Sequence, residues 1–244
     1  MGGAVARRLP LALAVALALL TTGSAGAGSS PSSGGATARA YAIRVLVPGG
    51  GASTTVLSSP PQDADAFGGG FSYSGTEGPA VTTGSYTASV AATAGDSPSA
   101  SASAEVTNLS LFGGEVTASD VVARARATGR PGSASGDLSG GGVTGLTVDG
   151  QPAGEGRVAL GDWGYAIVGE QSSAQTPSPP GYHGFSTALD IHLTADHGGL
   201  PANTEIQVGY AEASGSAPAS PPGRSRRRSR SGSRCRRGGR RGRR

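Results

Sequence analysis

Lysine is absent from this chain of 244 residues, and cysteine, methionine and tryptophan each occur once. The single cysteine, Cys235, excludes an intramolecular disulfide, so a folded domain must be held by packing and hydrogen bonds alone. We interpret Cys235 as an incidental residue that can at most pair with a second molecule. Because arginine replaces lysine throughout and Ala, Gly, Pro and Ser dominate, we infer a GC-rich source genome of the actinobacterial kind.

Aromatic residues are also scarce, at 5% of the sequence, whereas the chain has 43 glycines and 16 prolines. This composition excludes a core built on large rings and predicts a thin core spread over many short segments. Valine, leucine and isoleucine nevertheless recur in short alternating runs, which a disordered chain lacks. We therefore expect a folded middle between flexible ends.

Charge is divided unevenly along the chain. The formal net charge is +4, yet all 16 carboxylates and only six arginines lie in 28–223, which leaves that segment at −10. The last 21 residues, Arg224–Arg244, hold 12 arginines and no acidic residue. Since net charge bears on solubility and partners rather than on fold, the sequence predicts an acidic domain followed by a basic tail.

The N-terminus has the pattern of a secretory signal peptide, 1–27. Arg7 and Arg8 precede an apolar run from Leu11 to Leu20, and Ala25 and Ala27 follow in A-x-A register. The run is too short for the roughly 20 residues of a membrane-spanning helix. We expect export, cleavage after Ala27, and no transmembrane segment in the cleaved chain.

The remaining chain divides by composition into a flexible linker at 28–37, a β domain at 38–213, a Pro/Ala/Ser linker at 214–223 and the arginine-rich tail at 224–244. Alternating apolar residues and bounding Gly/Pro clusters predict strands in the β domain. These strands are expected at 41–47, 56–57, 86–92, 105–112, 115–128, 146–148, 157–170, 189–194 and 205–210. Loops are expected at 58–70 and in the Pro/Ser-rich segment after Glu170.

Alternation also predicts which side chains share a face of each strand. The first strand is expected to place Tyr41, Ile43, Val45 and Val47 opposite Arg44. The long run at 157–170 is expected to place Trp163, Tyr165 and Ile167 opposite Ala166 and Val168. Later strands are expected to set Leu189, Ile191 and Leu193 against Asp190, His192 and Thr194, and Ile206, Val208 and Tyr210 against Glu205 and Gln207.

Two dipeptides predict hairpins, because their residues adopt positive φ readily. Gly113-Gly114 joins 105–112 to 115–128, and Asp149-Gly150 follows the strand at 146–148. Within 115–128, Val121, Ala123, Ala125 and Ala127 alternate with Arg124 and Arg126. A helix capped by Ser119 or Asp120 is the alternative for this run, and we favour the strand. Many short strands with Gly/Pro turns predict a single all-β antiparallel sandwich or meander.

Three segments carry a family resemblance: EVTNLSLFGGEVTASDVVARARA at 105–127, GLTVDGQPAGEGRVALGDWGYAIVGEQ at 145–171, and ALDIHLTADHGGLPANTEIQVGYAEA at 188–213. The chain resembles the choice-of-anchor P family of secreted actinobacterial proteins over most of 41–213. The resemblance implies a shared extracellular domain followed by a variable C-terminal anchoring segment, with no biochemical activity attached. The chain departs from that pattern in having no LPxTG-like motif and no apolar segment before the tail.

The histidines give one candidate metal cluster. His183, His192 and His197 lie near Asp190 and Asp196, but their spacing fits neither a zinc nor a calcium site. A solvated strand face explains Asp190 and His192 equally well. We therefore assign no metal ligands, and a metal-dependent enzyme at His183, His192 and Asp190 remains the weakest alternative.

Other motifs do not identify a catalytic site. Gly140, Gly142 and Gly145 match G-x-G-x-x-G, but a strand rather than a helix is expected to follow, so we interpret them as a loop. No G-x-S-x-G elbow is present, and Asn108-Leu109-Ser110 is an incidental sequon. The aromatic residues Trp163, Tyr165 and Tyr182 could stack on sugar rings if exposed, although core positions are the alternative. No catalytic or cofactor-binding residue is assigned.

The tail Arg224–Arg244 admits two interpretations. As written, it is a flexible polycation that would bind cell-wall or other anionic polymers with little sequence preference, and no specific nucleic acid. Alternatively, a Pro/Ala linker read out of frame yields arginine codons, and we favour this frameshift because an anchor is expected here. Re-reading the downstream DNA in its other two frames tests it.

The sequence therefore predicts a protein that is secreted, or held at the cell surface or wall, that is not an enzyme and has a structural, adhesive or envelope role. The alternative is an extracellular module that binds carbohydrate or an anionic polymer. No cofactor is expected.

Overall fold

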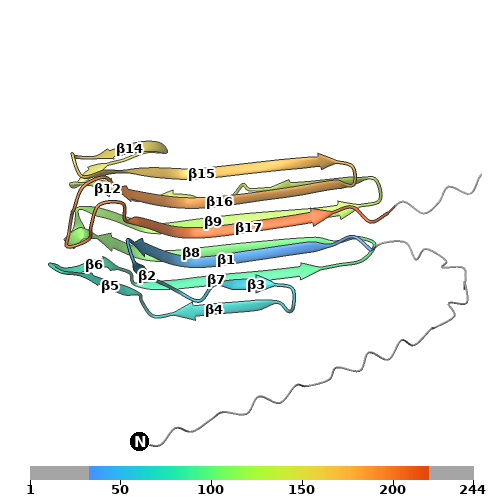
Figure 1. Ribbon diagram of the computed structural model, residues 1–244, viewed down its shortest axis with the longest axis horizontal. Coiled ribbons are helices and arrows are strands. Elements are labelled where there is room, and N and C mark those ends of the chain that lie inside the picture. Colours follow the sequence, from blue (N-terminus) through green and yellow to red (C-terminus); the bar gives the residue numbers. More distant parts are fainter. Residues whose placement is uncertain (1–32, 220–244) are drawn as a thin grey trace, which may run out of the picture. The chain divides into compact units, whose positions relative to one another are not determined.

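The computed structural model describes residues 33–219, which form two antiparallel β-sheets packed face to face (Figure 1). This arrangement confirms the predicted all-β fold. The only helical turn among these residues is the 3₁₀ turn η1 (Phe112–Gly114), and no helix here is long and apolar enough to cross a membrane. The predicted signal peptide and the tail Arg224–Arg244 lie outside the described residues.

The first sheet has seven strands. Their order is β14 (Gly156–Leu160), β15 (Gly164–Pro177), β16 (Pro180–Leu193), β17 (Glu205–Ser216), β1 (Ala36–Val47) and β2 (Gly50–Ser53), and β3 (Leu57–Ser59) also pairs with β1. Since β1 begins at Ala36 and β17 ends at Ser216, the sheet extends slightly beyond 38–213 at both ends.

The second sheet has ten strands. The main path runs through β13 (Gln151–Pro152), β12 (Thr147–Val148), β9 (Val116–Arg130), β8 (Ser99–Leu111), β6 (Gly78–Thr82) and β5 (Ser72–Gly75). Four more strands complete it: β10 (Ser133–Asp137) and β11 (Gly142–Thr144) on β9, β7 (Ser85–Thr93) on β8, and β4 (Ala64–Gly68) on β7.

Both predicted hairpins are confirmed. Gly113 and Gly114, with φ of 69° and 103°, lie in the turn between β8 and β9. Asp149 and Gly150, with φ of 50° and 72°, join β12 to β13. The helix considered for 115–128 is excluded, because β9 is a strand in which buried Ala123, Ala125 and Ala127 alternate with exposed Arg124 and Arg126.

Three segment predictions were wrong. The expected loop at 58–70 contains β4, which pairs with β7. The expected strand at 157–170 is interrupted by a turn at 161–163, where Gly161 has a φ of 59°. Trp163 lies in that turn, and β15 continues to Pro177, so most of the expected Pro/Ser loop is strand. Proline, which lacks a backbone N–H, is compatible with a strand at a sheet edge, because no neighbour on that side requires the missing donor.

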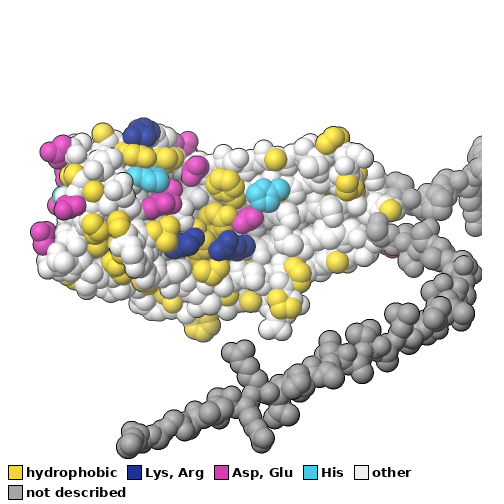
Figure 2. Space-filling model, viewed as in Figure 1, with side chains coloured by type: hydrophobic (Ala, Val, Ile, Leu, Met, Phe, Trp, Pro, Cys, Tyr) yellow, Lys and Arg dark blue, Asp and Glu magenta, His cyan; other side chains and the backbone are white. Residues whose placement is uncertain are grey.

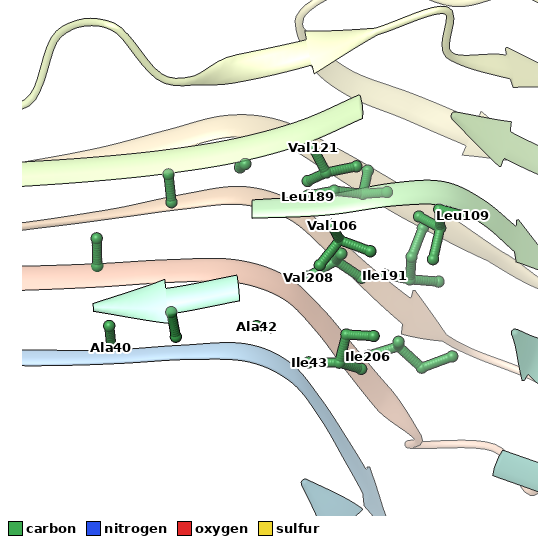
Figure 3. Close-up of a cluster of buried hydrophobic side chains, with 14 of the residues drawn as sticks. Ala40, Ala42, Ile43, Val106, Leu109, Val121, Leu189, Ile191, Ile206 and Val208 are labelled. Carbon is green, nitrogen blue, oxygen red and sulfur yellow. The ribbon is translucent and has the colours of Figure 1, made fainter. Parts of the chain in front are cut away.

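The core between the sheets changes in thickness along the strands. Toward the two chain ends it is built largely from alanines, including Ala38 and Ala40 on β1 and Ala125 on β9. Toward η1 it contains the larger side chains shown in Figure 3, among them Ile43, Leu109 and Ile191. The small side chains give the thin core expected from the composition.

Gly209 shifts the alternation of faces across the seven-stranded sheet. It has a φ of 70°, and it lies in register with Ala42, between the pairs Tyr41–Tyr210 and Ile43–Val208. On β17, Ile206 and Val208 are buried before this point and Ala211 and Ala213 after it, so the inward positions change from even to odd. Ala188 and Gly169, with a φ of 77°, continue the row on β16 and β15.

The shift corrects two predicted positions. Tyr41 does not share the face of Ile43, and Tyr210 does not share the face of Val208. Both tyrosines lie on the outer face of the sheet, where they hydrogen-bond to Gln207 and Glu212 respectively. On β17 the left-handed Gly209 moves the following side chains to the opposite face, and the inward positions of β1 change at the paired Ala42 as well.

Candidate binding face of the seven-stranded sheet

Hydrophobic, acidic, basic and histidine side chains gather over the middle of the sheet face toward the viewer in Figure 2. The seven-stranded sheet forms this face, and its strands β1, β16 and β17 supply most of these side chains. Much of the surrounding surface carries small or uncharged polar side chains (Figure 2). A concentration of chemically distinct groups on one face makes it the candidate functional site.

Three aromatic rings form a row across β1, β17 and β16. The Tyr41 and Tyr210 rings stack with centroids 4.6 Å apart and an interplanar angle of 5°. The Phe185 ring lies 6.1 Å from that of Tyr210, at 20°. Tyr41 is buried at 2% exposure, whereas Tyr210 and Phe185 are partly exposed. The rings of Phe185 and Tyr210 are therefore accessible to solvent, and the buried Tyr41 ring packs against that of Tyr210.

Glu212 is held in place beside this row. Its carboxylate accepts hydrogen bonds from His183 Nε2 at 2.8 Å and from the Tyr210 hydroxyl at 2.7 Å. Burial by itself raises the pKa of Glu212, but these two hydrogen bonds and the charges of His183 and Arg39 outweigh it, so the pKa lies below its ordinary value. Burial and the bond to Glu212 in turn raise the pKa of Tyr210. The face thus carries a fixed, ionised carboxylate.

A hollow of about 320 Å³ adjoins Glu212 between β1 and β3. Arg39 is exposed at its wall, and none of the arginines in 33–219 forms an ion pair with a carboxylate. The hollow therefore offers a free guanidinium, hydroxyls and a carboxylate within one small concavity. It is lined by Thr37, Ala38, Arg39, Ser58, Ser59, Pro60 and Glu212.

A second polar group lies on the same face nearer to β14. The Arg157 guanidinium lies 3.4 Å from the centroid of the Tyr165 ring, which stacks on His192 at 4.8 Å. His192 Nε2 lies 3.2 Å from Asp190 Oδ2. Burial is the main reason that the pKa of Asp190 is raised to about 6, and the charge of Glu205 adds to it. Asp190 Oδ1 is buried without a hydrogen-bond partner.

The structure does not bring the three predicted histidines together. His183 contacts Glu212, His192 contacts Asp190, and His197 contacts Glu115 at 2.7 Å. No group of three or more His, Cys, Asp or Glu side chains in 33–219 is arranged to hold a metal ion.

His197 belongs to a separate site at the η1 end of the molecule. Its ring stacks on Trp163 at 3.9 Å, with Phe112 edge-on at 5.1 Å. A cavity of about 580 Å³ opens beside it and includes Glu77 and Asp196 in its lining. The Asp196 carboxylate accepts a backbone hydrogen bond from Ala202 at 2.8 Å, so it stabilises its own turn.

The predicted sugar-stacking residues have different locations. Tyr182 is buried at 6% exposure, against Gly136 and Gly184. Trp163 packs on Phe112 and His197 and is partly buried. Of the three, Tyr165 alone lies on the candidate face. Sequence reasoning missed Phe185 and Tyr210, since the first lies in a segment predicted as loop and the second was assigned to the inner face.

The remaining predicted motifs lie in turns or strands away from the face. Gly140, Gly142 and Gly145 have φ of 81°, 156° and 65° and flank or begin the short strand β11, with no helix following. They therefore form a loop, as expected. Asn108 is exposed on β8 with a φ of 50°. Comparisons of the chain with protein-family models, curated proteins and solved structures find no match.

Proposed function

We propose that this protein is a non-enzymatic extracellular binding module that recognises a carbohydrate polymer on the outer face of its seven-stranded sheet. The observation that carries the proposal is the aromatic row Phe185–Tyr210–Tyr41 beside the hollow at Arg39 and Glu212. Aromatic rings pack on the C–H surface of sugars, while positioned carboxylate and guanidinium groups hydrogen-bond to hydroxyls. A flat sheet face suits an extended chain of sugar units.

The geometry of the histidines favours binding over catalysis. His183 and His197 each hydrogen-bond to a carboxylate, and no hydrogen bond within 33–219 joins a histidine ring to a Ser, Thr or Cys side chain. The metal-dependent alternative has little support, because His183 and His192 contact different carboxylates. Without a nucleophile beside a base, the usual route to covalent catalysis is missing from this face.

The proposed extracellular location rests on the signal-peptide pattern at 1–27 and on the resemblance of 41–213 to the choice-of-anchor P family. Binding of anionic polymers by Arg224–Arg244 is a separate proposal, which depends on the tail being in frame. Neutral polysaccharides are therefore tested first, because the arginine-rich tail has no charge attraction for them and does not contribute to the measured binding.

Binding of the secreted chain to a panel of immobilised neutral polysaccharides tests the proposed face. We expect Phe185→Ala to weaken binding to a recognised glycan by tenfold or more, because it removes a partly exposed ring from the row. The matched control is Phe67→Ala, since Phe67 is 86% exposed on β4 of the other sheet. Binding that responds equally to both substitutions, or to neither, would contradict the proposal, provided that thermal melting shows each variant folded.

A further inference from the structure

Strand β15 extends well beyond its neighbour on one side. β14 pairs with β15 only from Gly164 to Val168. From Glu170 to Pro177, β15 pairs with β16 on its other side, and no described strand covers its free edge. The seven-stranded sheet therefore has an open edge about eight residues long.

The register shows which peptide groups point out of this edge. The Pro180 carbonyl accepts a hydrogen bond from Ala217 N at 2.8 Å, so on β16 it points toward β17 and away from β15. Successive residues of an antiparallel strand direct their N–H and C=O groups to opposite sides. The N–H and C=O groups of Gly181 therefore point toward β15, and those of its partner Thr176 point toward β16. On β15 the N–H and C=O groups of Gln171, Ser173 and Gln175 then point outward.

The edge lacks the features that normally prevent pairing. Residues 171–177 are exposed throughout, and their sequence, QSSAQTP, contains no charge. Proline occurs only at the last position, Pro177. Edge strands are ordinarily protected by charged side chains, central prolines, bulges or a covering segment. A charge and a proline occur only at the two ends of this edge, at Glu170 and Pro177, and Gln171 Nε2 donates a hydrogen bond to the Leu138 carbonyl at 3.1 Å. Between them, residues 172–176 have unpaired ladder groups and none of these protections.

We propose that this edge pairs with the same edge of a second copy of the chain, which joins the two seven-stranded sheets into one. Antiparallel pairing about a two-fold axis at Ser173 places Gln171 opposite Gln175 of the partner and satisfies the outward groups of both strands. Residues 171–177 are uncharged, and Glu170 lies opposite Thr176 of the partner, so identical copies meet without like charges placed opposite each other. Amide and hydroxyl side chains lie along the seam.

The symmetry has a consequence for the candidate binding face. The two-fold axis that relates antiparallel neighbours is perpendicular to the sheet, so both copies present the outer face on the same side. On the proposed function, one polymer chain then contacts two aromatic rows, and linking two weak sites raises the overall avidity. The pairing itself does not depend on that function.

Sedimentation equilibrium of the full secreted chain tests the pairing. Measurements run from about 10 μM to about 1 mM, because small interfaces are weak, and a reducing agent excludes a cross-link through Cys235. We expect a monomer–dimer equilibrium. Ser173→Pro removes an outward N–H without removing a bond to β16, so it should raise the dissociation constant at least tenfold while the protein stays folded. Ser173→Ala keeps the N–H and serves as the matched control.

Three results would overturn the proposal. The chain could remain monomeric at about 1 mM, or a folded Ser173→Pro variant could dimerise as well as the parent. Slow amide exchange at Gln171, Ser173 and Gln175 in a purely monomeric sample would show that a segment of the same chain occupies the edge. The effect of Phe185→Ala on glycan binding is measured at concentrations where the chain is monomeric. The binding proposal and the pairing proposal can therefore fail independently.

Discussion

Among single residues, Asp190 differs from the other carboxylates of the described chain. It is 4% exposed, and its Oδ1 is the one buried side-chain oxygen or nitrogen in 33–219 without a hydrogen-bond partner. An ionised carboxylate in such a position loses hydration that its partners do not fully replace. The ionised Asp190 carboxylate therefore lowers the free energy of unfolding at neutral pH.

We expect Asp190→Asn to stabilise the protein at pH 7.5 by up to about 3 kcal/mol, since the pKa of Asp190 is raised from 3.8 to about 6. The folded state binds the proton more tightly than the unfolded state, so the wild-type penalty grows as pH rises from 4 to 6. The advantage of the variant should therefore vanish below about pH 4. The neighbouring ionisable groups are His192 on β16, Glu205 on β17, Glu170 on β15 and Tyr41 on β1.

Urea unfolding of both proteins across pH 3.5–8 measures this difference. Asp137→Asn provides a contrast of opposite sign, because hydrogen bonds from Ser139 lower the pKa of Asp137. The stabilisation from Asp137 is present at neutral pH and is lost as pH falls. A pH-independent effect of Asp190→Asn would show that its carboxyl does not titrate between the folded and unfolded states as argued.

At the scale of elements, the row through Gly209 decides which side chains reach the binding face. Alternation by itself places Tyr41 with Ile43 and Tyr210 with Val208, which turns both tyrosines into the core. The left-handed conformation of Gly209 moves Tyr210 outward, next to Glu212, and the change of face at the paired Ala42 moves Tyr41 outward, next to Gln207. Sequence periodicity therefore identified β17 but could not assign its second half to a face.

We expect Gly209→Ala to destabilise the protein by about 1–2 kcal/mol. An added Cβ would be strained at a φ of 70° and would lie 3.3 Å from Ala188 Cβ and 3.4 Å from Val121 Cγ1. Gly154→Ala is the control, because nothing lies within 4 Å of a Cβ there and its φ is not in the left-handed region. Equal thermal unfolding midpoints for the two variants would argue against strain at Gly209.

At the scale of the whole molecule, the sandwich is thin at the end where the chain enters and leaves. Alanines such as Ala38, Ala125 and Ala213 meet across the two sheets, with Tyr182 fitted against Gly136. A β carbon added at Gly136 would collide with the Tyr182 ring. Because interiors are closely packed, this end has no room for larger side chains.

We expect Ala125→Leu to lower the free energy of unfolding by about 1–3 kcal/mol through overpacking. Ala125 is fully buried on β9, so the added atoms must displace the opposite sheet. Ala159→Leu, on the exposed side of β14, should change stability little. Chemical denaturation of the pair provides the measurement, and a stabilised Ala125→Leu variant would mean that the thin end contains unfilled space.

Local sequence patterns were enough to predict the all-β fold, two of its turns and a core made largely of small side chains. Alternating Val, Ile and Ala and the dipeptides Gly113-Gly114 and Asp149-Gly150 act over a few residues, so local patterns suffice to identify them. Tertiary structure alone decided the candidate face, the hollow beside Glu212 and the open edge of β15. Each depends on which strands become neighbours, and on the backbone conformation of Gly209, which packing against β16 and the opposite sheet selects.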